Sequence, residues 1–194
     1  MNKFVWLFLG YRHVYIQMNF EFITIAKKEP YKFIHRNIID QLRKKLPTNS
    51  DLKLYPFSLK KGANIYGIIF GASHPRAVDK FLAIAWKRNE INGEANFDID
   101  DDKRKNQIDL FGDKKLTKIE EFQFNVREMI LNGEIKSNFE LLAYTYNQGH
   151  IGNHAAEYLR DLKRQKKIDY DGTSPLVTYE NVYKLKKKLI YKTL

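Results

Sequence analysis

The 194-residue sequence has no cysteine, fewer acidic than basic residues, and no apolar run long enough to cross a bilayer. The absence of cysteine excludes disulfide frameworks, thiolate zinc sites, Fe–S clusters and a cysteine nucleophile. The apolar run at residues 4–9 is too short for the hydrophobic region of a signal peptide and has no small-residue cleavage site behind it. We therefore expect a cytoplasmic protein without a membrane partner.

The signatures of common catalytic and cofactor-binding sites are also absent. The sequence contains no GxGxxG, P-loop, GxSxG or HExxH motif. Asp98, Asp100 and Asp102 have the spacing of a calcium loop, but Lys103 stands where that loop needs glycine. We expect no cofactor, no metal site and no catalytic residues, which makes the protein a non-enzyme.

The residues that are present favour a folded protein with an anionic partner. The chain has 34 Lys and Arg against 23 Asp and Glu, a net charge of +11, and 43% apolar residues. That apolar content is sufficient for a buried core. The positive charge favours nucleic acid over a membrane surface as the partner.

The N-terminal half predicts a sheet with helices. Alternating apolar residues and helical spacings indicate strands at 4–9, 14–22, 52–59 and 65–70, and helices at 31–46 and 75–87. The nearly continuous apolar run at 65–70 predicts a central strand that is buried on both faces. His74 or Ser73 is placed to cap the helix that follows, with Pro75 in its first turn.

The C-terminal part predicts a separate helical domain. Residues 89–117 combine a turn signal with dense charge, so we expect a linker there and a domain boundary near residue 113, giving domains at 1–112 and 113–194. Helices at 117–131, 137–147 and 151–165 precede expected strands at 176–179 and 183–191, an order typical of a winged helix-turn-helix. The predicted fold class is α+β: a small N-terminal sheet-and-helix layer followed by a C-terminal winged helix-turn-helix.

The third of these helices is the candidate recognition helix. Its early residues Asn153 and His154 are expected to be exposed and to approach bases, although Glu157 interrupts that face. From Arg160 to the C-terminus, ten basic residues stand against four acidic ones. We expect the phosphate contacts to come from these positions in the helix and on the wing: Arg160, Lys163, Arg164, Lys184, Lys186, Lys187 and Lys188.

His150 and His154 are spaced i, i+4, which could place two imidazoles on one helix face. Gly149 and Gly152 instead favour a turn position for His150, and no third ligand is evident. A metal site is therefore not predicted here.

The segment 64–81, followed by residues 85–87, resembles the three-Cys-motif partner proteins. In that family a buried strand ends in Ser/Asn-His-Pro, a helix with a Met- or Trp-Lys element follows, and a GMT-like winged helix comes later; here Ser73, His74, Pro75 and Trp86 occupy the motif positions. The resemblance implies a neighbouring radical-SAM-like partner protein in phage or mobile-element settings. It also implies that most of the family's methyltransferase-like domain is missing from this chain.

We therefore predict a nucleic-acid-binding module, with DNA favoured, that acts as an accessory or positioning subunit, in phage defence or mobile-element biology. One alternative is a nucleic-acid-modifying enzyme fragment with a degenerate site around Ser73, His74 and Asp79. Another is an adaptor whose winged helix binds protein. An exposed edge strand near the N-terminus would favour a homodimer.

Overall fold

The computed structural model describes residues 7–9, 12–13, 34–99, 101, 103 and 116–194. The chain divides into two compact units, Met1–Asp100 and Asp101–Leu194. The boundary expected near residue 113 stays a prediction, since residues 104–115 lie outside the described part. No helix among the described residues is long and apolar enough to span a membrane.

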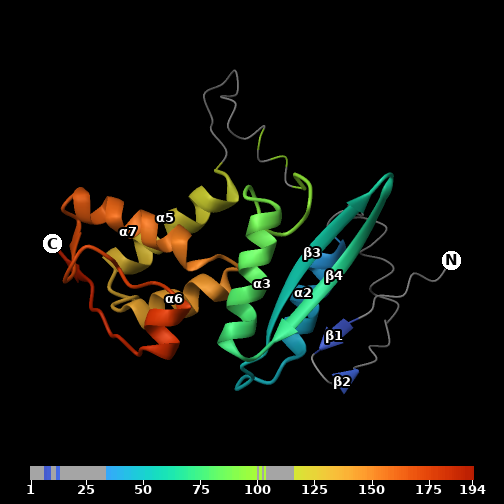
Figure 1. Ribbon diagram of the computed structural model, residues 1–194, viewed down its shortest axis with the longest axis horizontal. Coiled ribbons are helices and arrows are strands. Elements are labelled where there is room, and N and C mark those ends of the chain that lie inside the picture. The colour runs from blue at the N-terminus through green and yellow to red at the C-terminus, as the bar shows by residue number, and fades with distance from the viewer. Residues whose placement is uncertain (1–6, 10–11, 14–33, 100, 102, 104–115) are drawn as a thin grey trace. The chain divides into compact units, whose positions relative to one another are not determined.

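The first unit is built on a four-stranded sheet (Figure 1). Its strands have the order β2-β1-β4-β3, and their bounds are Leu7–Leu9 for β1, Arg12–His13 for β2, Lys53–Lys61 for β3 and Asn64–Ala72 for β4. β3 and β4 form an antiparallel hairpin whose turn uses Gly62 at φ +60°, and β1 pairs parallel to β4. β4 is therefore a central strand, as predicted.

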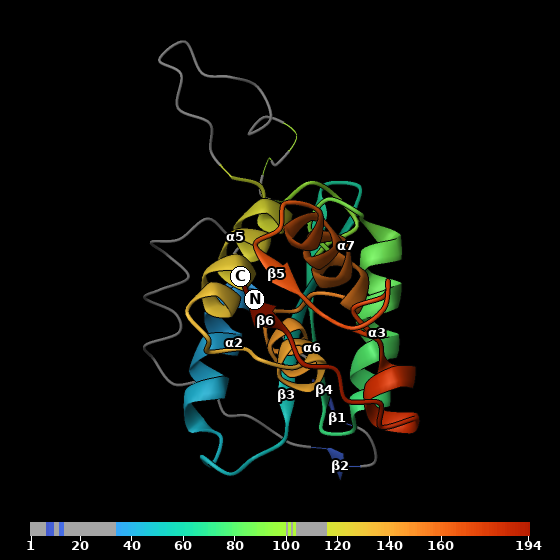
Figure 2. The ribbon, with the colours of Figure 1, turned by 90° about the vertical axis from the view of Figure 1, so that its left-hand side faces the viewer.

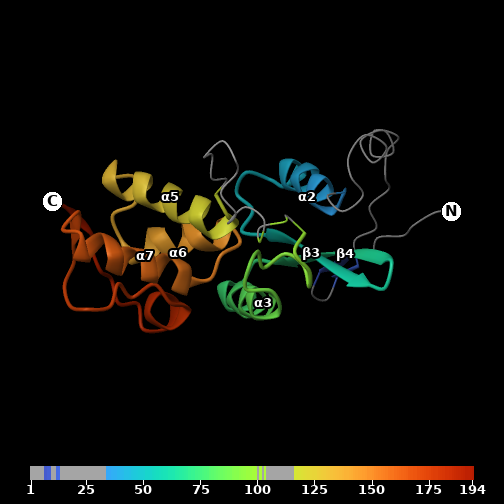
Figure 3. The ribbon, with the colours of Figure 1, turned by 90° about the horizontal axis from the view of Figure 1, so that it is seen from above.

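Two helices cover opposite faces of this sheet: α2 (Ile34–Lys45) and α3 (Pro75–Arg88), as Figures 2 and 3 show. On one face, Ile39 of α2 packs with Leu54 and Ile69. On the other, the Phe81 ring of α3 stacks on Phe70 with 4.1 Å between ring centroids. Alternate strand residues point to opposite faces, which explains why both faces need an apolar cover.

The structure corrects two expectations for this unit. β4 is not buried on both faces along its whole length, because Tyr66 is 53% and Ile68 is 39% exposed. Residues 89–99 are not a solvated linker: Ala95 and Ile99 are fully buried, and the main chain at 94–96 pairs with Ser58 of β3. Charge density alone could not distinguish this packed loop from a linker. The expected strand at 14–22 lies outside the described residues.

The second unit contains three helices: α5 (Lys118–Leu131), α6 (Asn138–Asn147) and α7 (Gly152–Arg164). Reciprocal capping boxes, Thr117 with Glu120 and Ser137 with Glu140, begin α5 and α6. The helices meet in a core of fully buried side chains: Val126, Leu141, Leu142, Ala155 and Leu159.

A small sheet completes this unit. β5 (Ile168–Asp169) and β6 (Lys192–Thr193) pair antiparallel and lie next to each other in Figure 2. Ser137, between α5 and α6, forms an antiparallel bridge with Ile190, so the segment before α6 lies along the chain that leads into β6. Three helices with this strand arrangement form a winged helix-turn-helix, so the predicted α+β fold class is confirmed.

The wing, defined here as residues 170–191 between β5 and β6, differs from the hairpin expected at 176–179 and 183–191. Its regular element is a single π-helical turn, η2 (Glu180–Lys184). Val177, Val182 and Leu189 of the wing are buried, whereas residues 183–188 are all exposed, a run that does not follow the alternation of a strand. The wing therefore folds back onto the domain body through its buried side chains.

Candidate nucleic-acid interface

The turn between α6 and α7 sets the direction of the candidate recognition helix. Gly149 has φ +72°, its N–H donates to Tyr146, and the N–H of His150 donates to Thr145. These bonds satisfy the last carbonyls of α6 and stop that helix. α7 begins three residues later, after Ile151.

The outward face of α7 carries four polar residues at helical spacing. Asn153, Glu157, Arg160 and Arg164 are all exposed, whereas Ala155, Leu159 and Leu162 are buried. Arg164 pairs with Asp161 one turn earlier. The structure therefore brings Asn153, Arg160 and Arg164 onto one exposed stripe, with Glu157 between them.

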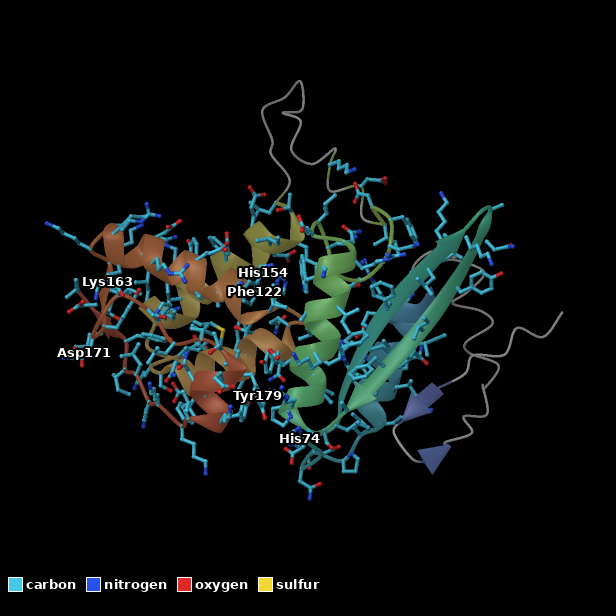
Figure 4. The ribbon with its side chains drawn as sticks, in the orientation of Figure 1. His74, Phe122, His154, Lys163, Asp171 and Tyr179 are labelled. Carbon is cyan, nitrogen blue, oxygen red and sulfur yellow. The ribbon has the colours of Figure 1, made fainter. Side chains whose placement is uncertain are left out.

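His154 is placed differently from the prediction. It is half-buried, and its Nδ1 lies 3.0 Å from Nδ1 of His150, whose ring stacks on Phe122 at 4.0 Å between centroids. Figure 4 labels Phe122 and His154. Burial and then the charge of Lys118 lower the pKa of His154 to about 4. His154 is thus a neutral residue turned toward the helix core rather than an exposed base contact.

Lys163 also has a structural position. Its Nζ donates to the carbonyl oxygens of Tyr170 and Gly172, lies 3.1 Å from an Asp169 carboxylate oxygen, and stands 4.2 Å from the centre of the Tyr170 ring. The hydrogen bond from Lys163 lowers the pKa of Asp169. These contacts hold the first turn of the wing against the end of α7, so phosphate binding would have to compete with them.

An open depression of about 490 Å³ lies beside Lys163, where α7 meets the wing. Figure 4 shows Lys163 and Asp171 at this end of the domain. The lining residues come from the exposed face of α7 and from the wing's first turn: Glu157, Arg160, Asp161, Lys163, Arg164, Tyr170, Gly172 and Thr173. Basic and acidic side chains therefore line this depression together with the ring of Tyr170.

The four lysines of the wing lie at the end of η2 and on the irregular backbone after it. Lys184 is the last residue of η2 and pairs with Glu180 at 2.6 Å, while Lys186, Lys187 and Lys188 follow the turn and are exposed. Lys186 has φ +51°, in the left-handed region. The predicted row of lysines is therefore present, but it does not lie on a strand.

Asn138 is a structural residue of this domain that no sequence pattern singles out. It is fully buried, its Nδ2 donates to the carbonyl oxygens of Leu176 and Lys187, and its Oδ1 accepts from the N–H of Leu189. A polar side chain at the first position of a helix is usually exposed, so the sequence alone would place Asn138 on the surface. Its position against the wing depends on contacts 38 to 51 residues away.

The motif residues of the first unit have local roles. His74 is exposed and caps α3, with its Nδ1 accepting from the N–H of Arg76 at 3.2 Å, which confirms the predicted cap. Ser73 is exposed, and Pro75 is the first residue of the helix. Trp86 is buried, and a Cβ on Gly93 would lie only 2.4 Å from its ring, so glycine is needed there.

Among the described residues, no group of three or more His, Asp and Glu side chains could hold an ion. Asp100 and Asp102 of the possible calcium loop lie outside the described part.

A family model for the GMT-like wHTH domain matches residues 98–175. No curated protein and no solved structure matches the chain. The match supports the winged-helix part of the resemblance, although it does not extend to the three-Cys-motif partner family itself. A winged helix-turn-helix domain suggests nucleic-acid binding in general.

Proposed function

We propose that the C-terminal unit binds duplex DNA and that α7 is its recognition helix. The observation that carries this proposal is the exposed stripe of Asn153, Glu157, Arg160 and Arg164 on the second helix of the helix-turn-helix. A major groove about 12 Å wide admits one α-helix. The stripe places the side chains that would enter it on one side of α7.

The residue types on this stripe suit the edges of base pairs. Arginine recognises guanine, asparagine recognises adenine, and a glutamate can accept from the exocyclic amine of cytosine. Glu157, which interrupts the face expected to approach bases, therefore has a role of its own on a groove-facing helix. Lys186, Lys187 and Lys188 are proposed to contact phosphates from the wing.

A salt series on duplex binding tests this proposal. We expect the logarithm of the binding constant to fall linearly with the logarithm of salt concentration, because cations are released from the phosphates that the protein contacts. Reversing the charge of Lys186, Lys187 and Lys188 to glutamate should reduce both affinity and slope. The matched control reverses Lys44, Lys45 and Lys87, three exposed lysines of the first unit, with the same change in net charge.

Two results would contradict the proposal. One is weak duplex binding at low salt with no slope. The other is an equal loss of affinity in both triple variants, which would indicate a general effect of net charge and no local contact at the wing.

The chain is proposed to act as an accessory that positions a partner, in phage defence or mobile-element biology, as its resemblance to three-Cys-motif partner proteins implies. The partner by that resemblance is a radical-SAM-like protein. Co-expression and co-purification with such a neighbour tests the assignment, and failure of a stable complex to form would count against it.

The chain is also proposed to form a homodimer. Light scattering tests this proposal, and a monomer at high concentration would contradict it.

We propose a non-enzymatic role for the Ser73–His74 element. The hydrogen bond from the N–H of Arg76 to His74 supports a helix-capping function. His74→Ala should then lower stability by about 1 kcal/mol, the usual effect of losing a cap, and leave DNA affinity unchanged. Urea denaturation and fluorescence anisotropy measure the two effects, and a changed affinity at unchanged stability would overturn the assignment.

A further inference from the structure

The surface of η2 combines aromatic and apolar groups with lysines. The rings of Tyr179 and Tyr183 stack with 5.7 Å between centroids and 28° between planes. Tyr183 is 36% exposed and Leu185 is 49% exposed. Figure 4 marks Tyr179 on this turn of the wing. Large apolar side chains on the surface, next to a run of lysines, need a reason beyond solubility.

The charges around Tyr183 favour an anionic partner. Lys184, Lys186, Lys187 and Lys188 follow it in sequence, and Glu180, which neutralises Lys184, is the one acid between residues 178 and 188. A protein partner with an apolar patch would not require this excess of positive charge. A polyanion that also offers flat apolar faces satisfies both features at once, and nucleic-acid bases provide those faces.

The shape of the wing excludes insertion into a duplex minor groove. A helical turn with its side chains is about 10 Å across, whereas the minor groove of B-DNA is about 6 Å wide. η2 is therefore too wide to enter it. The bases of an intact duplex are stacked on one another, so Tyr183 can reach a base face only where a base is unpaired.

We propose that the wing binds an unpaired nucleotide next to the duplex that α7 contacts, with a base stacked on Tyr183 and its phosphates held by Lys186–Lys188. This inference rests on the proposed function and deepens it: the substrate is a duplex with a single-stranded extension. Tyr179 supports the platform, because its stacking against Tyr183 holds the accepting ring in place before binding.

The experiment uses the full chain and three fluorescent probes that share one duplex. The first probe has blunt ends. The second carries a six-nucleotide single-stranded extension, which is tested at each end of the duplex separately. The third carries an abasic extension of the same length. The abasic probe retains the phosphates and lacks the bases. We expect the extension with bases to bind about tenfold more tightly than the abasic one, the gain typical of stacking one or two bases.

Substitutions of Tyr183 then test whether the higher affinity for the extension with bases depends on its ring. Tyr183→Ala should remove that gain, and Tyr183→Phe should retain it, because stacking needs the ring and not the hydroxyl. Tyr66→Ala is the matched control, since Tyr66 is an exposed tyrosine of the first unit. Thermal unfolding of each variant establishes that it is folded before its affinity is compared.

The outcomes separate this inference from the proposed function. Tight, salt-dependent binding to the blunt duplex without a base-dependent gain retains the proposed function and overturns the inference. Equal gains from the abasic and normal extensions also overturn it, since phosphates alone would explain them. Binding to none of the three probes overturns both, and leaves a protein partner as the occupant of this surface.

Discussion

Asn138 joins the helix-turn-helix to the wing through one buried amide. Its side chain bonds to Leu176, Lys187 and Leu189, and its own N–H donates to the carbonyl of Leu189. Leu176 has φ +54°, a strained value for a large side chain, and the bond from Asn138 to its carbonyl holds it there. A single residue therefore sets the conformation of both ends of the segment that carries the lysines.

We expect Asn138→Ala to lower the free energy of unfolding by about 2–4 kcal/mol, because it leaves buried backbone groups of the wing without partners. Urea denaturation monitored by circular dichroism measures the change. Asn153→Ala, an exposed asparagine on α7, serves as the control and should change stability by less than about 0.5 kcal/mol. Equal effects of the two substitutions would contradict the role given to Asn138.

The His150–His154 pair is a second feature at the residue scale. The 3.0 Å approach of the two Nδ1 atoms needs one nitrogen to donate and the other to accept, so at least one of the two rings is neutral in the folded domain. Burial first, then Lys118 and His154, lower the pKa of His150 to about 2. Both pKa values lie below the unfolded value of about 6.5.

This pair predicts a loss of stability in mild acid. Because the folded pKa values are lowered, the stabilisation is fully present above pH 6.5 and is lost as the pH falls through the unfolded pKa toward the folded ones. The expected slope is about 1.4 kcal/mol per pH unit for each histidine. His154→Gln keeps a hydrogen-bonding group beside His150 and should roughly halve that slope in urea denaturation between pH 7 and 5. A wild-type stability that is constant over this range would contradict the prediction.

At the scale of elements, α7 and the wing are in contact at the start of the helix. A Cβ on Gly152 would lie 2.0 Å from the carbonyl oxygen of Val177 and 3.4 Å from Leu142. The nearest atom belongs to the backbone and cannot rotate away. Glycine is therefore required because the wing's main chain crosses the first turn of the recognition helix there.

Gly152→Ala should destabilise the domain by about 2–4 kcal/mol, as a backbone clash normally does, although alanine is the better helix former by about 1 kcal/mol. Thermal unfolding measures the shift. Glu157→Ala on the exposed face of the same helix is the control for effects of helix propensity. A stabilised Gly152→Ala variant would mean that the wing does not press on α7.

The helices could be predicted because their signals are local. Thr117 with Glu120 and Ser137 with Glu140 mark helix starts within three residues, and the structure has both capping boxes. The wing could not be predicted in the same way. Its conformation follows from Asn138 and Gly152, whose partners lie 25 or more residues away in sequence.

The candidate interface was predictable to the extent that exposure follows helical spacing. Asn153, Arg160 and Arg164 are exposed at positions where α7 turns away from its core. The expectation that His154 is exposed was wrong, since its ring turns toward His150, which stacks on Phe122. The phosphate contact expected of Lys163 stays a prediction, and its Nζ already donates to carbonyls of the wing. Side-chain partners of this kind depend on tertiary contacts that periodicity does not report.

At the scale of the whole molecule, the net charge of +11 is unevenly distributed along the chain, with ten basic residues against four acidic ones after residue 159. Such a concentration steers a polyanion to one region of the protein. Groove contacts from α7 and phosphate contacts from the wing should then have different effects on DNA affinity when each is removed.

We expect Arg160→Ala to cost about 1–3 kcal/mol on a preferred duplex and to relax sequence preference. Lys187→Ala should instead weaken all duplexes alike and reduce the salt slope by about 0.9. Anisotropy titrations on a duplex selected from a random pool, and on its scrambled form, distinguish the two. Identical profiles for both variants would contradict the division between α7 and the wing.

The outer edge of β3 has a consequence for how copies of this chain can associate. Arg43 donates to the carbonyl of Leu54, Pro56 has no N–H, and Ser58 and Lys60 bond to the 94–96 segment, so the backbone groups along that edge are occupied or missing. A sheet that can add strands at both edges can grow into a fibre, whereas a sheet blocked at one edge cannot. Among the described strands, β2 is the other edge of the sheet, and pairing of two copies through that edge alone would end at a closed pair of chains.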